Sequence, residues 1–173
     1  NIDCNLHFVQ DKKGCWYVLR FTSMVTHRFF SNVLKIQKGD KTGKFDVPDL
    51  IRDSSEKIQK AFIRGFFDGE VGIGISTKNP WLEIGQSSVT DKPIPIFSWV
   101  KNKLDSLGIY LNGPTRMSNQ NAWRFRTGSK IVIVKYRKII GSRHPNKIKK
   151  LKEIENFKYG KKSKCNYRSR GPY

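Results

Sequence analysis

The sequence predicts an α+β fold whose core runs from about residue 54 to residue 140 in the order α-ββ-α-ββ-α. Helices are indicated where apolar residues recur every three or four positions, and strands where short runs of strand-forming residues lie between turn residues. Turn residues such as Lys78-Asn79-Pro80 and Gly108 separate the segments. We expect helices over 54–69, 95–107 and 131–140, and strands over 71–77, 81–88, 109–117 and 122–127.

The first core helix has a regular apolar pattern. Asp53 or Ser54 is the expected N-cap, and Glu56 lies in the first turn, where a negative charge is favourable. The expected apolar face comprises Ile58, Ala61, Phe62, Gly65, Phe66 and Gly69. The second core helix is expected to stop at Gly108, because glycine commonly follows a helix end.

Both flanks of this core carry further expected elements. Residues 6–22 are expected to form a hairpin that turns at Lys12-Lys13-Gly14, and a helix is expected over 24–36. This order of strand and helix resembles the strand that begins at Trp123 and the helix that follows it. A basic helix is expected over 145–157, before a basic tail. We therefore divide the chain into an N-terminal hairpin-helix extension with its linker, the core, and a basic C-terminal helix and tail, over residues 1–50, 51–143 and 144–173.

The composition indicates a folded protein that binds a polyanion. The 173 residues carry a formal net charge of +20, and 12% of them are aromatic, which excludes a disordered polyelectrolyte. Nucleic acid is the commonest partner for such a charge, because phosphate neutralisation releases counterions. No apolar run has the ~20 residues that span a bilayer, and no basic amphipathic helix favours a membrane surface.

Cysteine usage indicates a reducing compartment. Cys4, Cys15 and Cys165 are odd in number and scattered, which argues against a disulfide framework. Cys4 and Cys15 combined with His7 and His27 match the spacing of no common zinc site. We expect a cytoplasmic, nucleoid-associated protein of a prokaryote, with an organelle matrix as the alternative.

The segment from Phe62 to Glu70 carries the chemistry. Gly65 and Gly69 lie on one helix face, where each costs about 1 kcal/mol relative to alanine, so we expect a second helix to approach closely. Asp68 and Glu70 lie at the helix C-terminus, where carboxylates oppose the helix dipole and unpaired carbonyls are exposed. These oxygen donors suit a hard cation such as Mg²⁺. Two such helix ends brought together would form a two-metal phosphodiester site.

This segment resembles the LAGLIDADG motif of homing endonucleases, in the F-x-x-G-x-x-D-G-E form often seen in archaeal introns and inteins. The surrounding order of elements also resembles that family's core, so the resemblance covers about residues 50–140. It implies that Glu70 binds the catalytic metal together with the carbonyl of Gly69, and that Asp68 is structural. It further implies a homodimer with an interface at Phe62, Gly65, Phe66 and Gly69.

Two further site residues and one departure follow from the resemblance. Lys130, which opens the third core helix, lies where the family often places a lysine near the scissile phosphate. Gln86 resembles a polar residue often found near the metal-bound water, although a solvent-facing strand glutamine is the plainer interpretation. Val71 stands where the family usually has glycine. Unless Gly72 makes the sharp turn instead, we expect a distorted metal geometry.

The resemblance also implies that a concave antiparallel sheet binds DNA. Strand alternation places Arg124 and Arg126 on one face, with Trp123 and Phe125 directed into the core. The lysines of residues 147–164 are expected to bind phosphates. The DNA-binding residues that we expect are Lys78, Arg116, Arg124, Arg126, Lys161 and Lys162.

The leading hypothesis is a Mg²⁺-dependent, homodimeric endonuclease of the single-motif, intron-encoded type. It would make a double-strand break at a long, roughly palindromic DNA site, with two or more divalent ions shared at the dimer axis. One alternative on the same fold is an intron RNA maturase, or a DNA-binding protein that no longer cuts. Another is a basic RNA-binding protein such as a ribosomal component, which would leave the glycine and glutamate pattern unexplained.

Overall fold

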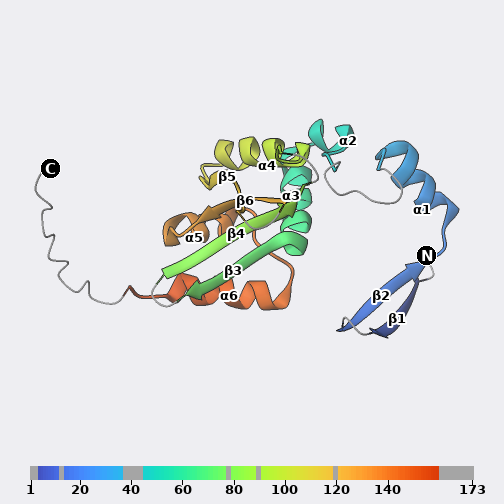
Figure 1. The fold of residues 1–173 in the computed structure, drawn as a ribbon. Helices are drawn as coiled ribbons and strands as arrows, with labels where there is room; N and C mark the ends of the chain where they lie inside the picture. Colours follow the sequence, from blue (N-terminus) through green and yellow to red (C-terminus); the bar gives the residue numbers. More distant parts are fainter. Residues whose placement is uncertain are drawn as a thin grey trace, which may run out of the picture. The chain divides into compact units, whose positions relative to one another are not determined.

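The computed structural model describes residues 4–11, 14–36, 45–76, 79–88, 91–118 and 121–159. Internal contacts divide the chain into two compact units. Unit 1 comprises residues 1–41 and 48–50, and unit 2 comprises residues 42–47 and 51–173. Figure 1 shows the helices and strands of both units. Within the described ranges, no helix is long and apolar enough to cross a membrane.

Unit 1 is an antiparallel hairpin followed by a helical segment. Strands β1 (Cys4–Asp11) and β2 (Gly14–Phe21) pair along their whole length. The helical segment comprises α1 (Met24–Arg28) and a π-helical turn, η1 (Phe29–Val33). The hairpin and the helix expected from the sequence are confirmed, although the helical segment ends at Val33 rather than at residue 36.

Unit 2 contains a four-stranded antiparallel sheet in the order β3-β4-β6-β5. Ile84 lies opposite both Val71 and Phe125, so these three side chains share the inner face of the sheet. The outer face is defined by the alternate residues Gly72, Gly74, Trp81, Glu83, Arg124 and Arg126. The strands are β3 (Val71–Ser76), β4 (Asn79–Ser87), β5 (Asn112–Arg116) and β6 (Ala122–Thr127).

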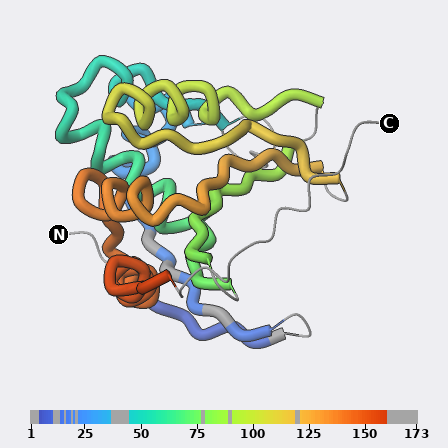
Figure 2. Tube along the Cα trace, turned by 90° about the vertical axis from the view of Figure 1, so that its left-hand side faces the viewer, coloured from blue at the N-terminus to red at the C-terminus, as the bar shows by residue number. Residues whose placement is uncertain are grey.

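Four helices share one hydrophobic core with the inner face of this sheet. They are α3 (Glu56–Glu70), α4 (Pro95–Ser106), α5 (Lys130–Ile139) and α6 (Pro145–Asn156), and a single turn, α2 (Asp49–Arg52), precedes them. Figure 2 shows α6 nearly end-on, and this helix contacts α5. From α3 to α5 the elements follow the order α-ββ-α-ββ-α, so the predicted α+β fold is confirmed.

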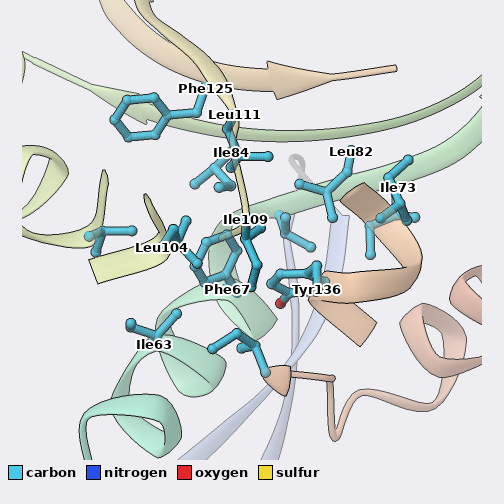
Figure 3. Close-up of a cluster of buried hydrophobic side chains, with 14 of the residues drawn as sticks. Ile63, Phe67, Ile73, Leu82, Ile84, Leu104, Ile109, Leu111, Phe125 and Tyr136 are labelled. Carbon is cyan, nitrogen blue, oxygen red and sulfur yellow. The ribbon is translucent and has the colours of Figure 1, made fainter. Parts of the chain in front are cut away.

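Aromatic pairs connect the helices to the sheet in the core of unit 2 (Figure 3). Phe125 of β6 stacks on Phe97 of α4 with ring centroids 4.6 Å apart. Phe67 of α3 packs against Tyr136 of α5 with centroids 5.2 Å apart. All four rings are buried, so the end of α3 is fixed against α5, and α4 is fixed against the sheet.

The two residues that α3 buries in the core lie outside the apolar face expected from the sequence. Its buried residues are Ile63 and Phe67, which form the ridge next to the expected apolar face. On the expected face, Phe62 and Phe66 are half-buried, while Ile58, Ala61, Gly65 and Gly69 are exposed. The expected apolar face is therefore not the one that unit 2 buries most deeply, and it is the face on which the resemblance places the dimer interface.

The start of α3 also differs from the prediction. Ser55 is the N-cap residue, with extended dihedral angles and no hydrogen bond from its side chain to the helix. The Ser54 hydroxyl instead donates a hydrogen bond to the carbonyl of Ile51 at 2.7 Å, within the preceding turn. The predicted cap at Asp53 or Ser54 is therefore wrong. By contrast, the predicted stop after α4 is confirmed, since Gly108 has a positive φ of 69°.

Candidate active site

The expected metal ligands lie where α3 leads directly into β3. Glu70 is the last residue of α3 and its side chain is exposed. Val71 follows with extended dihedral angles (φ −81°, ψ 129°), and its N–H still donates to the carbonyl of Phe67. Neither Val71 nor Gly72 has a positive φ. Gly72 therefore does not make the sharp turn instead, and Val71 has a backbone conformation that suits a β-branched residue, so that the expected distortion of the metal geometry stays a prediction.

Glu70 and Gln86 line the same pocket. The pocket has a volume of about 330 Å³ and is formed by the end of α3 together with residues of the sheet. Its lining residues are Glu70, Gly72, Glu83, Gly85, Gln86, Ser87, Met117 and Ala122. Two of the three residues predicted to be catalytic thus lie together, in a polar setting that contains a second carboxylate.

Gln86 does not have the solvent-facing position of the plainer interpretation. It lies opposite Trp123 in the sheet register and is half-buried. Its Oε1 atom is buried and has no hydrogen-bond partner in the part of the chain that the structure describes. An unpaired buried polar atom costs about 1–3 kcal/mol. Gln86 therefore has an unused acceptor at the pocket that contains Glu70.

The donors at this pocket fit a hard divalent cation. The carboxylate of Glu70 and the amide oxygen of Gln86, two residues that line the pocket, are oxygen donors of the kind that Mg²⁺ prefers, and Gly69 directly precedes Glu70 at the end of α3. Among the described residues, no group of three or more His, Cys, Asp and Glu side chains could hold a metal ion. A Mg²⁺ ion at Glu70 would therefore need further ligands from water, from a phosphate or from a second chain.

Asp68, the first acid of the motif, holds the segment that leads into α6. Its carboxylate accepts a hydrogen bond from the Ser142 hydroxyl. Its other oxygen accepts the N–H of Arg143 at 2.9 Å, across 75 residues of sequence. Both oxygens of Asp68 are thus engaged by protein donors, whereas the carboxylate of Glu70 has no hydrogen-bond or ion-pair partner among the residues that the structure describes.

Lys147 of α6 strengthens the same connection from the opposite side. Its ammonium donates to the carbonyls of Phe67 at 3.1 Å and of Asp68 at 2.7 Å, in the last turn of α3. A cation there complements the negative end of the helix dipole. Burial lowers the pKa of Lys147, an effect that the charges of Asp68 and Glu70 oppose. Lys147 is therefore used within the fold rather than in the phosphate contact expected of it.

Lys130 lies apart from the Glu70 pocket. It begins α5, and its ammonium donates to the carbonyl of Phe157, the residue that follows α6, at 2.7 Å. Lys130 is not among the residues that line the pocket of Glu70 and Gln86. One chain thus brings together two of the predicted catalytic residues but not the third.

The glycines of α3 face open space. A Cβ atom added to Gly65 or to Gly69 would meet no atom within 4 Å. Beside them, Phe62 packs edge-on against Trp99, with ring centroids 6.0 Å apart. Nothing in the described part of this chain requires glycine at either position. The surface beside these glycines is therefore open in the described part of the chain.

The outer face of the sheet carries two of the predicted arginines with an acid between them. Arg124 Nη1 lies 3.2 Å from Glu83 Oε2, and Arg126 Nε lies 3.8 Å from the same atom. Arg116 pairs instead with the exposed Asp91 at 2.9 Å. No local sequence pattern indicates a role for Glu83, because its partners lie on another strand. Three further predicted DNA-binding residues lie outside the described residues, namely Lys78, Lys161 and Lys162.

Comparison with known proteins supports one family. No protein-family model matches the chain. The chain is 24% identical over 152 residues to homing endonuclease I-ApeI from Aeropyrum pernix. The similarity covers 87% of this chain but only 65% of that relative, less than two thirds of its length. Together with the Phe62–Glu70 motif and the α-ββ-α-ββ-α core, this similarity supports an assignment of the chain to the LAGLIDADG homing endonuclease family.

Proposed function

We propose that the chain is a site-specific DNA endonuclease that cuts both strands of a long, roughly palindromic target as a homodimer. The observation that carries the proposal is the pocket at the end of α3, which combines the free carboxylate of Glu70 with the unpaired amide oxygen of Gln86. The outer sheet face supports it by offering Arg124 and Arg126 to a duplex. The net charge of +20 favours a polyanionic substrate.

In this proposal each residue around the pocket has its own role in phosphodiester hydrolysis. Glu70 and the carbonyl of Gly69 would hold Mg²⁺, which when bound supplies a Lewis acid and lowers the pKa of a bound water. Gln86 Oε1 would accept a hydrogen bond from the attacking water and so orient it. Lys130 would approach the scissile phosphate by exchanging the Phe157 carbonyl for a phosphate oxygen. Lys147 keeps the last turn of α3, and with it Glu70, at a constant position.

The homodimer is proposed because α3 has an exposed side shaped for close approach. Gly65 and Gly69 would let the α3 helices of two chains pack tightly, with Phe62 and Phe66 beside the contact. Gly65→Leu places a large side chain in open space of one chain, so its fold should persist while dimerisation is lost. Sedimentation tests this expectation, and a Gly65→Leu variant that stays dimeric contradicts the proposed interface.

The activity is tested with a plasmid library that carries intron-free gene sequences. The library is incubated with the protein and Mg²⁺, and the new ends are sequenced, which reports the target and the cut positions. Glu70→Gln should lower cleavage by about 100-fold or more, while DNA binding stays nearly unchanged. The matched control is Glu153→Gln, which removes a carboxylate from the exposed surface of α6 and should cleave normally.

Two outcomes contradict parts of this proposal. Equal cleavage by wild-type protein and Glu70→Gln refutes the active-site assignment. The maturase alternative is tested by titrating duplex DNA and intron RNA side by side at fixed salt, since phosphate contacts dominate both affinities. Tighter binding of intron RNA than of any duplex, without cleavage, replaces the endonuclease by a maturase.

A further inference from the structure

An acid lies at the centre of the surface that is proposed to bind DNA. Glu83 is on the outer face of β4, in register with Gly72 of β3 and Arg126 of β6. Its Oε2 accepts a hydrogen bond from Arg124 Nη1 at 3.2 Å and lies 3.8 Å from Arg126 Nε. One carboxylate thus lies between two guanidinium groups of the neighbouring strand.

This position is unfavourable for simple phosphate binding. A carboxylate repels phosphate and neutralises part of the arginine charge that would attract it. The Glu83 side chain is only 22% exposed, whereas that of Asp91, the partner of Arg116, is 86% exposed. Asp91 can therefore turn into solvent when a duplex binds, whereas Glu83, which also lines the pocket of Glu70, has little solvent into which to turn.

The residues next to Glu83 restrict it further. Trp81 precedes Glu83 by two positions and lies on the same face of β4. Its ring covers the strand opposite, since a Cβ on Gly72 would lie 2.9 Å from the Trp81 ring, and one on Gly74 would lie 3.1 Å from it. The indole thus fills the space on the β3 side, which leaves the carboxylate of Glu83 directed at Arg124 and Arg126.

We propose that Glu83 is a specificity-determining residue that directs Arg124 and Arg126 to a G·C pair in the major groove rather than to phosphate. Guanine offers the O6 and N7 acceptors that suit arginine, and cytosine offers an N4 donor that suits a carboxylate. Such a base pair is bound while the ion pair stays intact, whereas a phosphate must compete with Glu83 for the same guanidinium. Because it concerns the same DNA surface, the role of Glu83 rests on the proposed function.

The test compares Glu83→Gln with the matched control Asp91→Asn. Each variant removes one carboxylate from an arginine, so both change the net charge equally. Binding is measured at fixed salt, with Ca²⁺ in place of Mg²⁺, to the duplex recovered from the plasmid library and to a scrambled duplex of the same length. Glu83→Gln should bind the scrambled duplex more tightly and lose about fivefold or more of its preference. Asp91→Asn should bind both duplexes more tightly and keep its preference.

A set of single base-pair changes in the recovered duplex locates the effect. Glu83→Gln should lose the preference for G·C at one position in each half-site. Arg124→Lys, which keeps the charge but lacks the planar fork of the guanidinium, should lose it at the same position. An unchanged preference in Glu83→Gln, equal losses in both acid variants, or a loss at a different position in Arg124→Lys overturns the role of Glu83. If the wild-type chain prefers no duplex at all, the proposed function itself fails.

Discussion

The strand–helix connection of unit 1 and the corresponding connection of unit 2 follow the same local plan. β2 is followed two residues later by Ser23, which accepts the N–H three positions on at 3.2 Å. β6 is followed two residues later by Ser129, which accepts the N–H three positions on at 3.5 Å. The helical residues that follow are 24–33 in unit 1 and 130–139 in unit 2. Strand, serine cap and helix thus have the same spacing.

The ends of the two helical segments also correspond. The second residue after each segment has a positive φ, 50° at Lys35 and 70° at Gly141. Glycine adopts this conformation without steric cost, whereas a lysine does not. The same backbone path is therefore followed in both places, although only unit 2 has the residue type that favours it.

The two connections differ in what covers them. Tyr136 of α5 is 1% exposed, whereas Phe30, which follows its serine cap at the same spacing, is 42% exposed. On the hairpin of unit 1, Phe8 and Tyr17 contact each other and are 57% and 69% exposed. In unit 2, Tyr136 instead packs against Phe67 of α3 within the hydrophobic core. Local sequence is thus enough to form the strand and the capped helix, but burial depends on residues elsewhere in the unit.

The largest expected contrast comes from removing one aromatic ring from each unit. Phe125→Ala leaves a cavity beside Phe97 in the core of unit 2 and should cost about 3–5 kcal/mol of unfolding free energy. Phe8→Ala removes a largely exposed ring and should change it by less than about 0.5 kcal/mol. Urea denaturation measures both. Similar losses in the two variants would show that the hairpin of unit 1 contributes its own core.

A smaller effect is expected at the connection between α3 and α6, for which the described part of unit 1 has no counterpart. Lys147→Met keeps most of the side-chain length but leaves the carbonyls of Phe67 and Asp68 without their donor. The expected loss is about 1–3 kcal/mol of unfolding free energy. Lys150→Met, at an exposed position of the same helix, is the control and should change little. Equal stability of the two variants in urea would contradict the capping role of Lys147.

The sequence predicts those features of this molecule that depend on neighbouring residues. The order of elements and the stop at Gly108 follow from short-range patterns, and the structure confirms both. The contacts of Lys147 with the end of α3 join residues about 80 positions apart, so no local pattern indicates them. The same holds for the burial of Gln86 and for the ion pairs of Glu83, which depend on strand register.

The core face of α3 could not be predicted for a related reason. Its sequence offers two apolar ridges, one with Gly65 and Gly69 and one with Ile63 and Phe67. Helical periodicity treats both as candidates for burial. Which ridge enters the core is decided by the partners on the sheet and on α5, which are distant in sequence. The ridge left exposed is the one to which the motif assigns the dimer contact.

In unit 1, phenylalanine follows the serine cap at the spacing of Tyr136. Replacing Tyr136 with phenylalanine should give the smallest change in the free energy of unfolding. In Tyr136→Phe the core ring remains, but the hydroxyl that donates to the Gly141 carbonyl at 3.1 Å is lost. At neutral pH this should cost about 1 kcal/mol of unfolding free energy, the usual net value of one such hydrogen bond. Tyr110→Phe, at an exposed position, is the control and should leave the stability unchanged.

The pH dependence of this difference tests the burial of Tyr136 directly. Burial, together with the negative charge of Asp68, raises the pKa of Tyr136 in the folded protein. Above about pH 10, the ordinary pKa of tyrosine, the unfolded chain releases this phenolic proton while the folded chain retains it. The wild type should therefore lose up to about 1.4 kcal/mol per pH unit that Tyr136→Phe does not lose. The higher unfolding free energy of the wild type, measured by urea denaturation, should therefore vanish near pH 11. A difference between the two proteins that stays constant from pH 7 to pH 11 would show that the phenol ionises freely in the folded state.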